Sequence, residues 1–123
     1  MSGERRPGKR LSIFIGEYDR YQHQSLAEAV LERAREEGLA GATLMRGIEG
    51  FGPSGRLRTT RLLSSSDDLP IVIEIIDDAH RIDRFIPVLD AMIKEGLVTV
   101  EDADIHFYRR TGADPLDDDR QRP

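Results

Sequence analysis

The sequence lacks cysteine and has no surplus of basic residues. The absence of cysteine excludes a disulfide framework, a thiolate nucleophile and a cysteine-ligated zinc site. The 18 lysines and arginines are outnumbered by 23 aspartates and glutamates, so the formal net charge is −5. Nucleic-acid-binding proteins usually carry a basic surplus, and this composition therefore argues against such a partner.

Long apolar runs are also absent. No stretch approaches the roughly 20 apolar residues that span a bilayer. The first apolar run, Leu11 to Ile15, is shorter than the apolar region of a signal peptide. We therefore expect a soluble, cytoplasmic protein without direct membrane insertion, and a length of 123 residues predicts one domain.

Motifs for catalysis and for metal binding are missing too. No candidate nucleophile stands at a recognisable spacing from a base, and no Gly-Lys-Ser/Thr follows the glycines to make a Walker loop. His23, His80 and His106 lack the helical spacing of metal ligands. We expect no catalytic residue and no metal ligand. Two alternatives stay open: a small oligomeric enzyme that uses Glu17 or Glu74, and a divalent-cation site in the same cleft.

Apolar periodicity is what the chain does have. Alternation with a period of two predicts strands, and stripes at helical spacing predict helices. Strands are predicted over 9–16, 42–52, 69–77 and 98–109, and helices over 25–37 and 78–94. Ser25 with Glu28 has the spacing of a capping box, and Asp78 is a candidate cap of the second helix.

The order of these elements is β-α-β followed by β-α-β. It predicts an α+β, ferredoxin-like fold, in which two helices cover one face of an antiparallel sheet. We expect the domain to span 9–110, with a mobile loop over 53–66, a disordered N-terminal tail over 1–8 and a disordered acidic tail over 111–123.

The strand over 69–77 is apolar on both faces, with Glu74 as the one polar residue between Pro70 and Asp77. Because two helices cover only one face of the sheet, something must cover the other, and a second copy of the same sheet is the simplest cover. We therefore expect a homo-oligomer. The alternative is a monomer in which this strand is central and its far side only mildly apolar.

Glycines gather at the end of the second predicted strand. Gly47, Gly50 and Gly52 fall within six residues, and such glycines usually allow a bulge or the close approach of another backbone or a ligand. Backbone N–H groups in a glycine-rich turn can form a nest for an anion.

Arginines occupy the same region. Arg56, Arg58 and Arg61, with Arg46 near the base of the loop, have the chemistry to hold phosphate or carboxylate groups bidentately. The alternative is a solvated loop whose arginines balance an acidic surface. A short hairpin around 57–63 is also expected.

Three segments carry a family resemblance: Gly50-Phe51-Gly52, Ile73-Glu74-Ile75 and Arg110-Thr111-Gly112. With GLAGATLMRGIEGFG, DLPIVIEIID and GLVTVED, they resemble the PII signalling superfamily over roughly 9–112. The similarity is strongest to a PII-like branch of uncharacterised proteins, the domain of unknown function numbered one-ninety. It implies a homotrimer with inward-facing sheets, a ligand cleft between subunits and a loop that changes shape to meet a partner.

The resemblance also implies roles for matched residues. The 50–52 segment would wrap nucleotide phosphates, Glu74 and Ile76 would lie beside the adenine, and Arg110 matches the last arginine of the C-terminal nucleotide-binding segment. Two departures stand out. Pro53 replaces a basic residue, and 94–99 lacks the Gly-Asp-Gly-Lys phosphate clamp.

Together these observations predict a signalling protein without a resident cofactor, which binds a small anionic effector between subunits. An adenine nucleotide is one candidate effector. The loop over 53–66 would regulate a protein partner, such as a membrane channel or transporter. The expected ligand-binding residues are Arg46, Gly47, Gly50, Phe51, Gly52, Arg56, Arg58, Glu74, Ile76 and Arg110.

Overall fold

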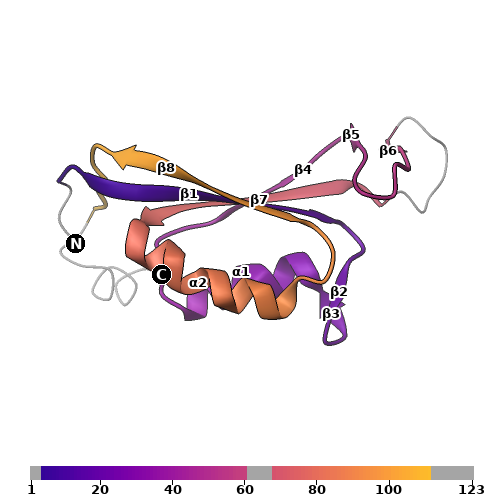
Figure 1. Ribbon diagram of the computed structural model, residues 1–123, viewed down its shortest axis with the longest axis horizontal. Coiled ribbons are helices and arrows are strands. Elements are labelled where there is room, and N and C mark those ends of the chain that lie inside the picture. The colour runs from indigo at the N-terminus through magenta and orange to yellow at the C-terminus, as the bar shows by residue number, and fades with distance from the viewer. Residues whose placement is uncertain (1–3, 61–67, 112–123) are drawn as a thin grey trace.

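A four-stranded antiparallel sheet forms the frame of the protein (Figure 1). The computed structural model describes residues 4–60 and 68–111. The strand order is β4-β7-β1-β8, and the helices α1 and α2 both pack against one face of the sheet. This arrangement confirms the predicted ferredoxin-like fold. The bounds are β1 (Arg6–Gly16), α1 (Leu26–Glu36), β4 (Thr43–Arg46), β7 (Pro70–Asp78), α2 (Ala79–Met92) and β8 (Leu97–Ile105).

The first strand begins earlier than its apolar pattern indicates. β1 starts at Arg6 rather than at residue 9, because β8 reaches Ile105 and β7 reaches Asp78, and both offer backbone partners to the polar residues at this end. Arg6 also forms an ion pair with Asp78. The N-terminal segment expected to be disordered therefore contributes 6–8 to the sheet. The last strand, by contrast, ends at Ile105 instead of 109.

Two short hairpins were not predicted in this form. The first pairs β2 (Arg20–Tyr21) with β3 (Gln24–Ser25), just before α1. The second pairs β5 (Glu49–Gly50) with β6 (Arg58–Thr59). It replaces the end of the predicted strand over 42–52 and encloses most of the 53–66 loop. The rest of that loop, with Arg61 and the far half of the hairpin expected around 57–63, lies outside the described residues.

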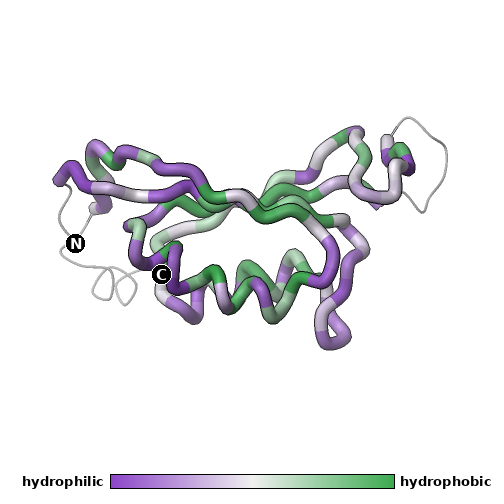
Figure 2. The backbone as a smooth tube through the Cα atoms, viewed as in Figure 1, coloured by the Kyte–Doolittle hydropathy of each residue, from purple (hydrophilic) through white to green (hydrophobic). Residues whose placement is uncertain are grey.

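The core lies between the sheet and the helices, where apolar residues gather (Figure 2). Alternate residues of the central strands point toward the helices, as the period-two pattern predicts. The buried members include Leu11, Ile13, Ile71, Ile73, Ile75, Ile82, Phe85 and Leu89.

The two helices begin where the sequence predicts, but only one prediction about their caps is correct. Ser25 Oγ accepts the Glu28 backbone N–H at 3.3 Å, which confirms the N-cap of α1. Asp78 occupies the N-cap position of α2 without a side-chain capping bond. Its carboxylate instead lies at the ion pair with Arg6.

The face of the sheet away from the helices carries an apolar row across all four strands. Met45 lies opposite Val72, Val72 opposite Phe14, and Phe14 opposite Leu97. Phe14, Met45 and Leu97 are 41%, 44% and 56% exposed in the single chain. The neighbouring row holds Glu74 between polar partners, so β7 is less uniformly apolar on this face than on the other. The homo-oligomer stays a prediction.

Candidate functional site

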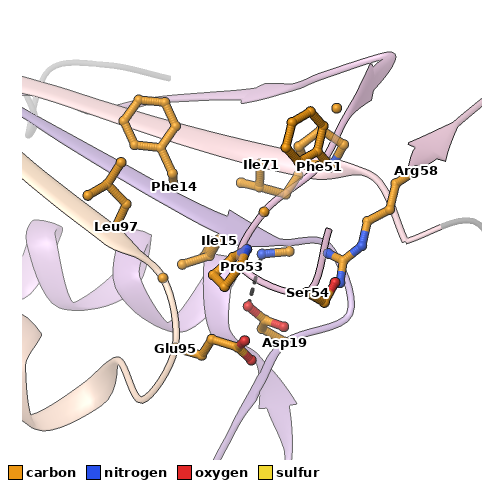
Figure 3. A pocket seen from close by; sticks show the side chains of 15 residues that line it. Phe14, Ile15, Asp19, Phe51, Pro53, Ser54, Arg58, Ile71, Glu95 and Leu97 are labelled. Atoms are coloured by element: carbon orange, nitrogen blue, oxygen red, sulfur yellow. Dashed lines mark hydrogen bonds between the residues drawn. The ribbon is translucent and has the colours of Figure 1, made fainter. Parts of the chain in front are cut away.

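A pocket of about 500 Å³ opens at the end of the sheet where β1 ends and β7 and β8 begin (Figure 3). The 50–54 segment forms one wall, and the connection from α2 to β8 forms another. Most of the surface is apolar, from Phe14, Ile15, Phe51, Pro53, Ile71 and Leu97. The pocket thus combines a predicted glycine segment with a part of the chain more than 40 residues away.

Arg58 supplies the positive charge of the pocket. Its Nη1 lies 3.1 Å from Asp68 Oδ2, and the two side chains are 25% and 14% exposed. The Arg58 Nε is buried, and no described group accepts its hydrogen. Buried donors normally have an acceptor, so this N–H is a candidate ligand contact.

Gly16 lets the guanidinium come close to the backbone of β1. A Cβ at Gly16 would lie 2.7 Å from Arg58 Nη1, and 3.2 Å from both Asp19 Oδ1 and Asp68 Oδ1. Three charged side chains therefore converge over one glycine. Asp19 itself is held in place because its Oδ2 accepts the Gly16 N–H at 2.9 Å.

Asp68 connects this charge cluster to the turn after β1. Its Oδ1 accepts the Tyr18 N–H at 2.8 Å, while its Oδ2 pairs with Arg58. Beside it, the Glu17 N–H donates to the Leu69 carbonyl at 2.9 Å. These bonds hold the start of β7, the turn after β1 and strand β6 together at the pocket floor.

Four of the predicted ligand-binding residues line the pocket: Gly50, Phe51, Gly52 and Arg58. Phe51 is 73% exposed, so its ring is available to a ligand or to another chain. A Cβ at Gly52 would meet nothing within 4 Å. Gly52 therefore leaves open space at the pocket wall, as the prediction of a close ligand approach requires.

Three other predicted residues lie near the pocket without lining it. Arg46 Nη1 pairs with Glu17 Oε2 at 2.9 Å, which directs both side chains to each other. A Cβ at Gly47 would lie 2.9 Å from Pro70 Cγ, so this glycine serves packing. Arg56 is exposed on the loop.

Glu74, Ile76 and Arg110 lie away from the pocket. Glu74 sits mid-sheet on the uncovered face. Ile76 lines a second hollow of about 430 Å³ at the other end of the sheet, and Arg110 follows β8. Within one chain the predicted set is divided between separate places. The inter-subunit cleft that would join them stays a prediction.

The sequence missed three carboxylates at or beside the pocket: Asp19, Asp68 and Glu95. No local spacing links positions so far apart. A signal for Glu95 exists in its neighbour Gly96, which has φ +154° and whose Cβ would lie 2.8 Å from the Phe14 carbonyl oxygen. Only glycine fits so close to β1, and that contact brings Glu95 and Leu97 to the pocket.

Titratable groups outside the pocket form no metal centre among the described residues, where no three His, Asp or Glu side chains gather around one point. His106 Nε2 lies 3.6 Å from Asp104 Oδ2. Arg5 hydrogen-bonds to the same carboxylate at 2.6 Å and holds the pKa of Asp104 below its ordinary value. Across residues 4–60 and 68–111, no helix is long and apolar enough to cross a membrane.

Comparison with known families and sequences gives consistent matches. The family described as DUF190 (Uncharacterized ACR) matches residues 8–105. A UPF0166 protein of Aquifex aeolicus (strain VF5) is 37% identical over 99 residues, covering 80% of this chain and 93% of that protein. A UPF0166 protein of Methanocaldococcus jannaschii is 31% identical over 102 residues, covering 82% and 92%.

Solved structures share the fold at lower identity. One is CPII, a nitrogen regulatory PII-like protein from Thiomonas intermedia K12, bound to ADP, AMP and bicarbonate. It has a TM-score of 0.58 at 21% identity and covers 84% of this chain and 92% of its own. A putative PII-like signalling protein from Thermus thermophilus has a TM-score of 0.61 at 18% identity, covering 83% and 92%. These likenesses confirm the predicted PII-like fold.

Proposed function

This chain belongs to the DUF190 family, and we propose that it is a PII-like signalling protein that binds a small anionic effector in the pocket beside residues 50–54. The observation that carries the proposal is the Arg58 Nε, a buried N–H donor at the pocket that no described group satisfies. An anionic oxygen supplies the missing acceptor, because hydrogen bonds between guanidinium groups and anions are among the strongest in proteins.

The pocket walls support an organic effector. Phe14, Phe51 and Leu97 offer apolar surface on which a flat ring can pack. The glycines at 50 and 52 let the backbone approach a ligand. An adenine nucleotide combines such a ring with an anion, and the PII-like protein CPII was solved with ADP and AMP bound. We therefore propose adenine nucleotides as the first ligands to test.

Strand β6 provides a route from ligand to loop. Arg58 belongs to β6, which pairs with β5 at the base of the 53–66 loop. A ligand bound to Arg58 therefore acts directly on a strand that ends this loop. It shifts the loop only by its differential affinity for two loop conformations. The proposed readout is a protein partner, of which a membrane channel or transporter is one class, and the proposed location is the cytoplasm.

Assembly and the absence of turnover are part of the same proposal. A homotrimer would cover the apolar row on the open sheet face and would bring Arg110 or Ile76 of one copy toward the pocket of another. We propose binding without catalysis, because the described pocket residues offer carboxylates and one arginine but no nucleophile paired with a base.

Isothermal titration of the purified protein with AMP, ADP, ATP and cyclic AMP tests the proposal. We expect at least one nucleotide to bind, and Arg58→Gln to weaken that binding at least about tenfold, since it removes a charged hydrogen bond. Arg84→Gln, on the exposed side of α2, removes the same charge away from the pocket and should leave affinity unchanged. If none of the four nucleotides binds, the nucleotide form of the proposal is wrong.

A further inference from the structure

The charges around the pocket are mostly negative. Among the described lining residues, Arg58 is the one cation, while Asp19 and Glu95 are carboxylates. Figure 3 shows Asp19 and Glu95 below the apolar wall and Arg58 at the opposite side from Phe14 and Leu97. A ligand in this space meets one positive and two negative side chains.

The cation is already paired with a carboxylate. Asp68 Oδ2 lies 3.1 Å from Arg58 Nη1, and Asp68 is held in that place by the Tyr18 N–H. A guanidinium has five N–H donors, so it can bind a second anion while keeping the first. The Nε hydrogen, which has no described acceptor, is the donor left for that role. One anionic group can therefore be accommodated.

A second negative charge on the ligand has no described cation in the lining to face. It would instead approach Asp19 or Glu95, and like charges within a few ångströms repel strongly at a partly dry site. Those carboxylates are good acceptors for N–H groups, which a ligand with an amino group provides.

From this charge arrangement we infer that the pocket selects an organic monoanion with an apolar ring and an N–H donor, and discriminates against polyanions. The inference rests on the proposed function, and it narrows the effector class within it. Asp68 and Glu95 are the specificity-determining residues. Glu95 repels a second ligand charge directly, and Asp68 lowers the attraction that Arg58 can exert on it.

A ligand series that varies charge at constant base tests the inference. The series is adenosine, the methyl phosphate ester of AMP, AMP, ADP and ATP, titrated by calorimetry without divalent cations. We expect the methyl ester, with one charge, to bind most tightly and AMP to bind about tenfold more weakly, with further losses for ADP and ATP. Adenosine should bind more weakly than the ester because it lacks the acceptor for Arg58.

Glu95→Gln is the main variant, because Glu95 is exposed and its removal leaves the fold intact. It should reduce the difference between the methyl ester and AMP severalfold. The control, Glu32→Gln on the exposed side of α1, changes net charge equally and should preserve the full difference. Asp68→Asn, checked for native unfolding behaviour, should raise AMP affinity. Higher salt should also narrow the difference.

The outcomes separate this inference from the proposed function. If affinity rises from the methyl ester to ATP, or if Glu95→Gln leaves the difference unchanged, the inference is overturned while nucleotide binding stands. If no member of the series binds, including adenosine, the nucleotide form of the proposed function fails first and the charge selection has no site.

Discussion

Gly96 illustrates how one residue positions a wall of the pocket. Its backbone has φ +154°, and a Cβ there would lie 2.8 Å from the Phe14 carbonyl oxygen and 3.1 Å from Ile15 Cγ2. A backbone atom cannot move aside as a flexible side-chain end can. The identity of this residue therefore controls how closely the start of β8 meets β1.

We expect Gly96→Ala to lower the free energy of unfolding by about 2–3 kcal/mol, because it combines a disfavoured backbone conformation with a steric clash. Urea unfolding followed by circular dichroism measures the change. Gly41→Ala is the control, since a Cβ at Gly41 meets nothing within 4 Å, and it should alter stability by less than about 1 kcal/mol. Equal effects of the two substitutions would contradict the role assigned to Gly96.

Asp104 is the residue for which a pH dependence can be stated. Its pKa is lowered chiefly by the hydrogen bond from Arg5. A lowered folded-state pKa means that the ionised carboxylate favours the fold above its ordinary pKa, and that this contribution is lost as pH falls through the lowered value. We expect NMR titration of the Asp104 carboxyl to give a pKa below that of an unperturbed aspartate, and Arg5→Ala to raise it. High salt should reduce the shift, since both groups are exposed.

At the scale of elements, Asp77 joins the two halves of the fold. It is 2% exposed, at the end of β7 on the helix side. Its Oδ2 accepts the Ala40 N–H at 2.9 Å, and its Oδ1 accepts the Asp78 N–H at 2.6 Å. Arg81 lies 4.0 Å away on α2. This one carboxylate ties the connection between α1 and β4 to the junction of β7 and α2.

Asp77→Ala should therefore cost about 2–4 kcal/mol of unfolding free energy, because it leaves two backbone N–H groups and an arginine without their acceptor. Denaturant unfolding measures it. Asp83→Ala is the matched control: Asp83 is 56% exposed and pairs with Lys9 on the surface, so its loss should cost less than about 1 kcal/mol. A small effect at Asp77 would show that other contacts hold these elements together.

At the scale of the whole molecule, the uncovered sheet face is the feature that a single chain leaves unexplained. The row from Met45 to Leu97 exposes large apolar side chains on all four strands. Contiguous exposed apolar surface usually marks an interaction site. A trimer through this face would place three pockets in one particle.

Sedimentation of the wild-type protein should give a mass three times that of the 13.9 kDa chain. Met45→Lys should dissociate the assembly, because it places an unpaired charge in the proposed interface. Ile48→Lys is the control, as Ile48 is 75% exposed on the connection between β4 and β5, outside the row. A wild-type protein that sediments as a folded monomer would remove the inter-subunit cleft.

The order of the principal elements and the residues of the core could be read from the sequence alone. Alternating apolar positions in β1 and β7 and the helical stripe of α2 reflect which side of each element is buried, and that burial is repeated along neighbouring residues. The Gly-Phe-Gly segment was also found correctly at the pocket, because glycine clusters within a strand pattern are a local signal of close approach.

Only the tertiary structure decided the charge of the site. Arg46 is held by Glu17, Arg58 is held by Asp68, and Asp19 and Glu95 face the same space. These meetings depend on the register of β1 with β7 and β8, and on where the chain turns between strands. Local periodicity carries no information about such register, so the sequence indicated an arginine-rich loop, while the folded chain places one arginine among carboxylates.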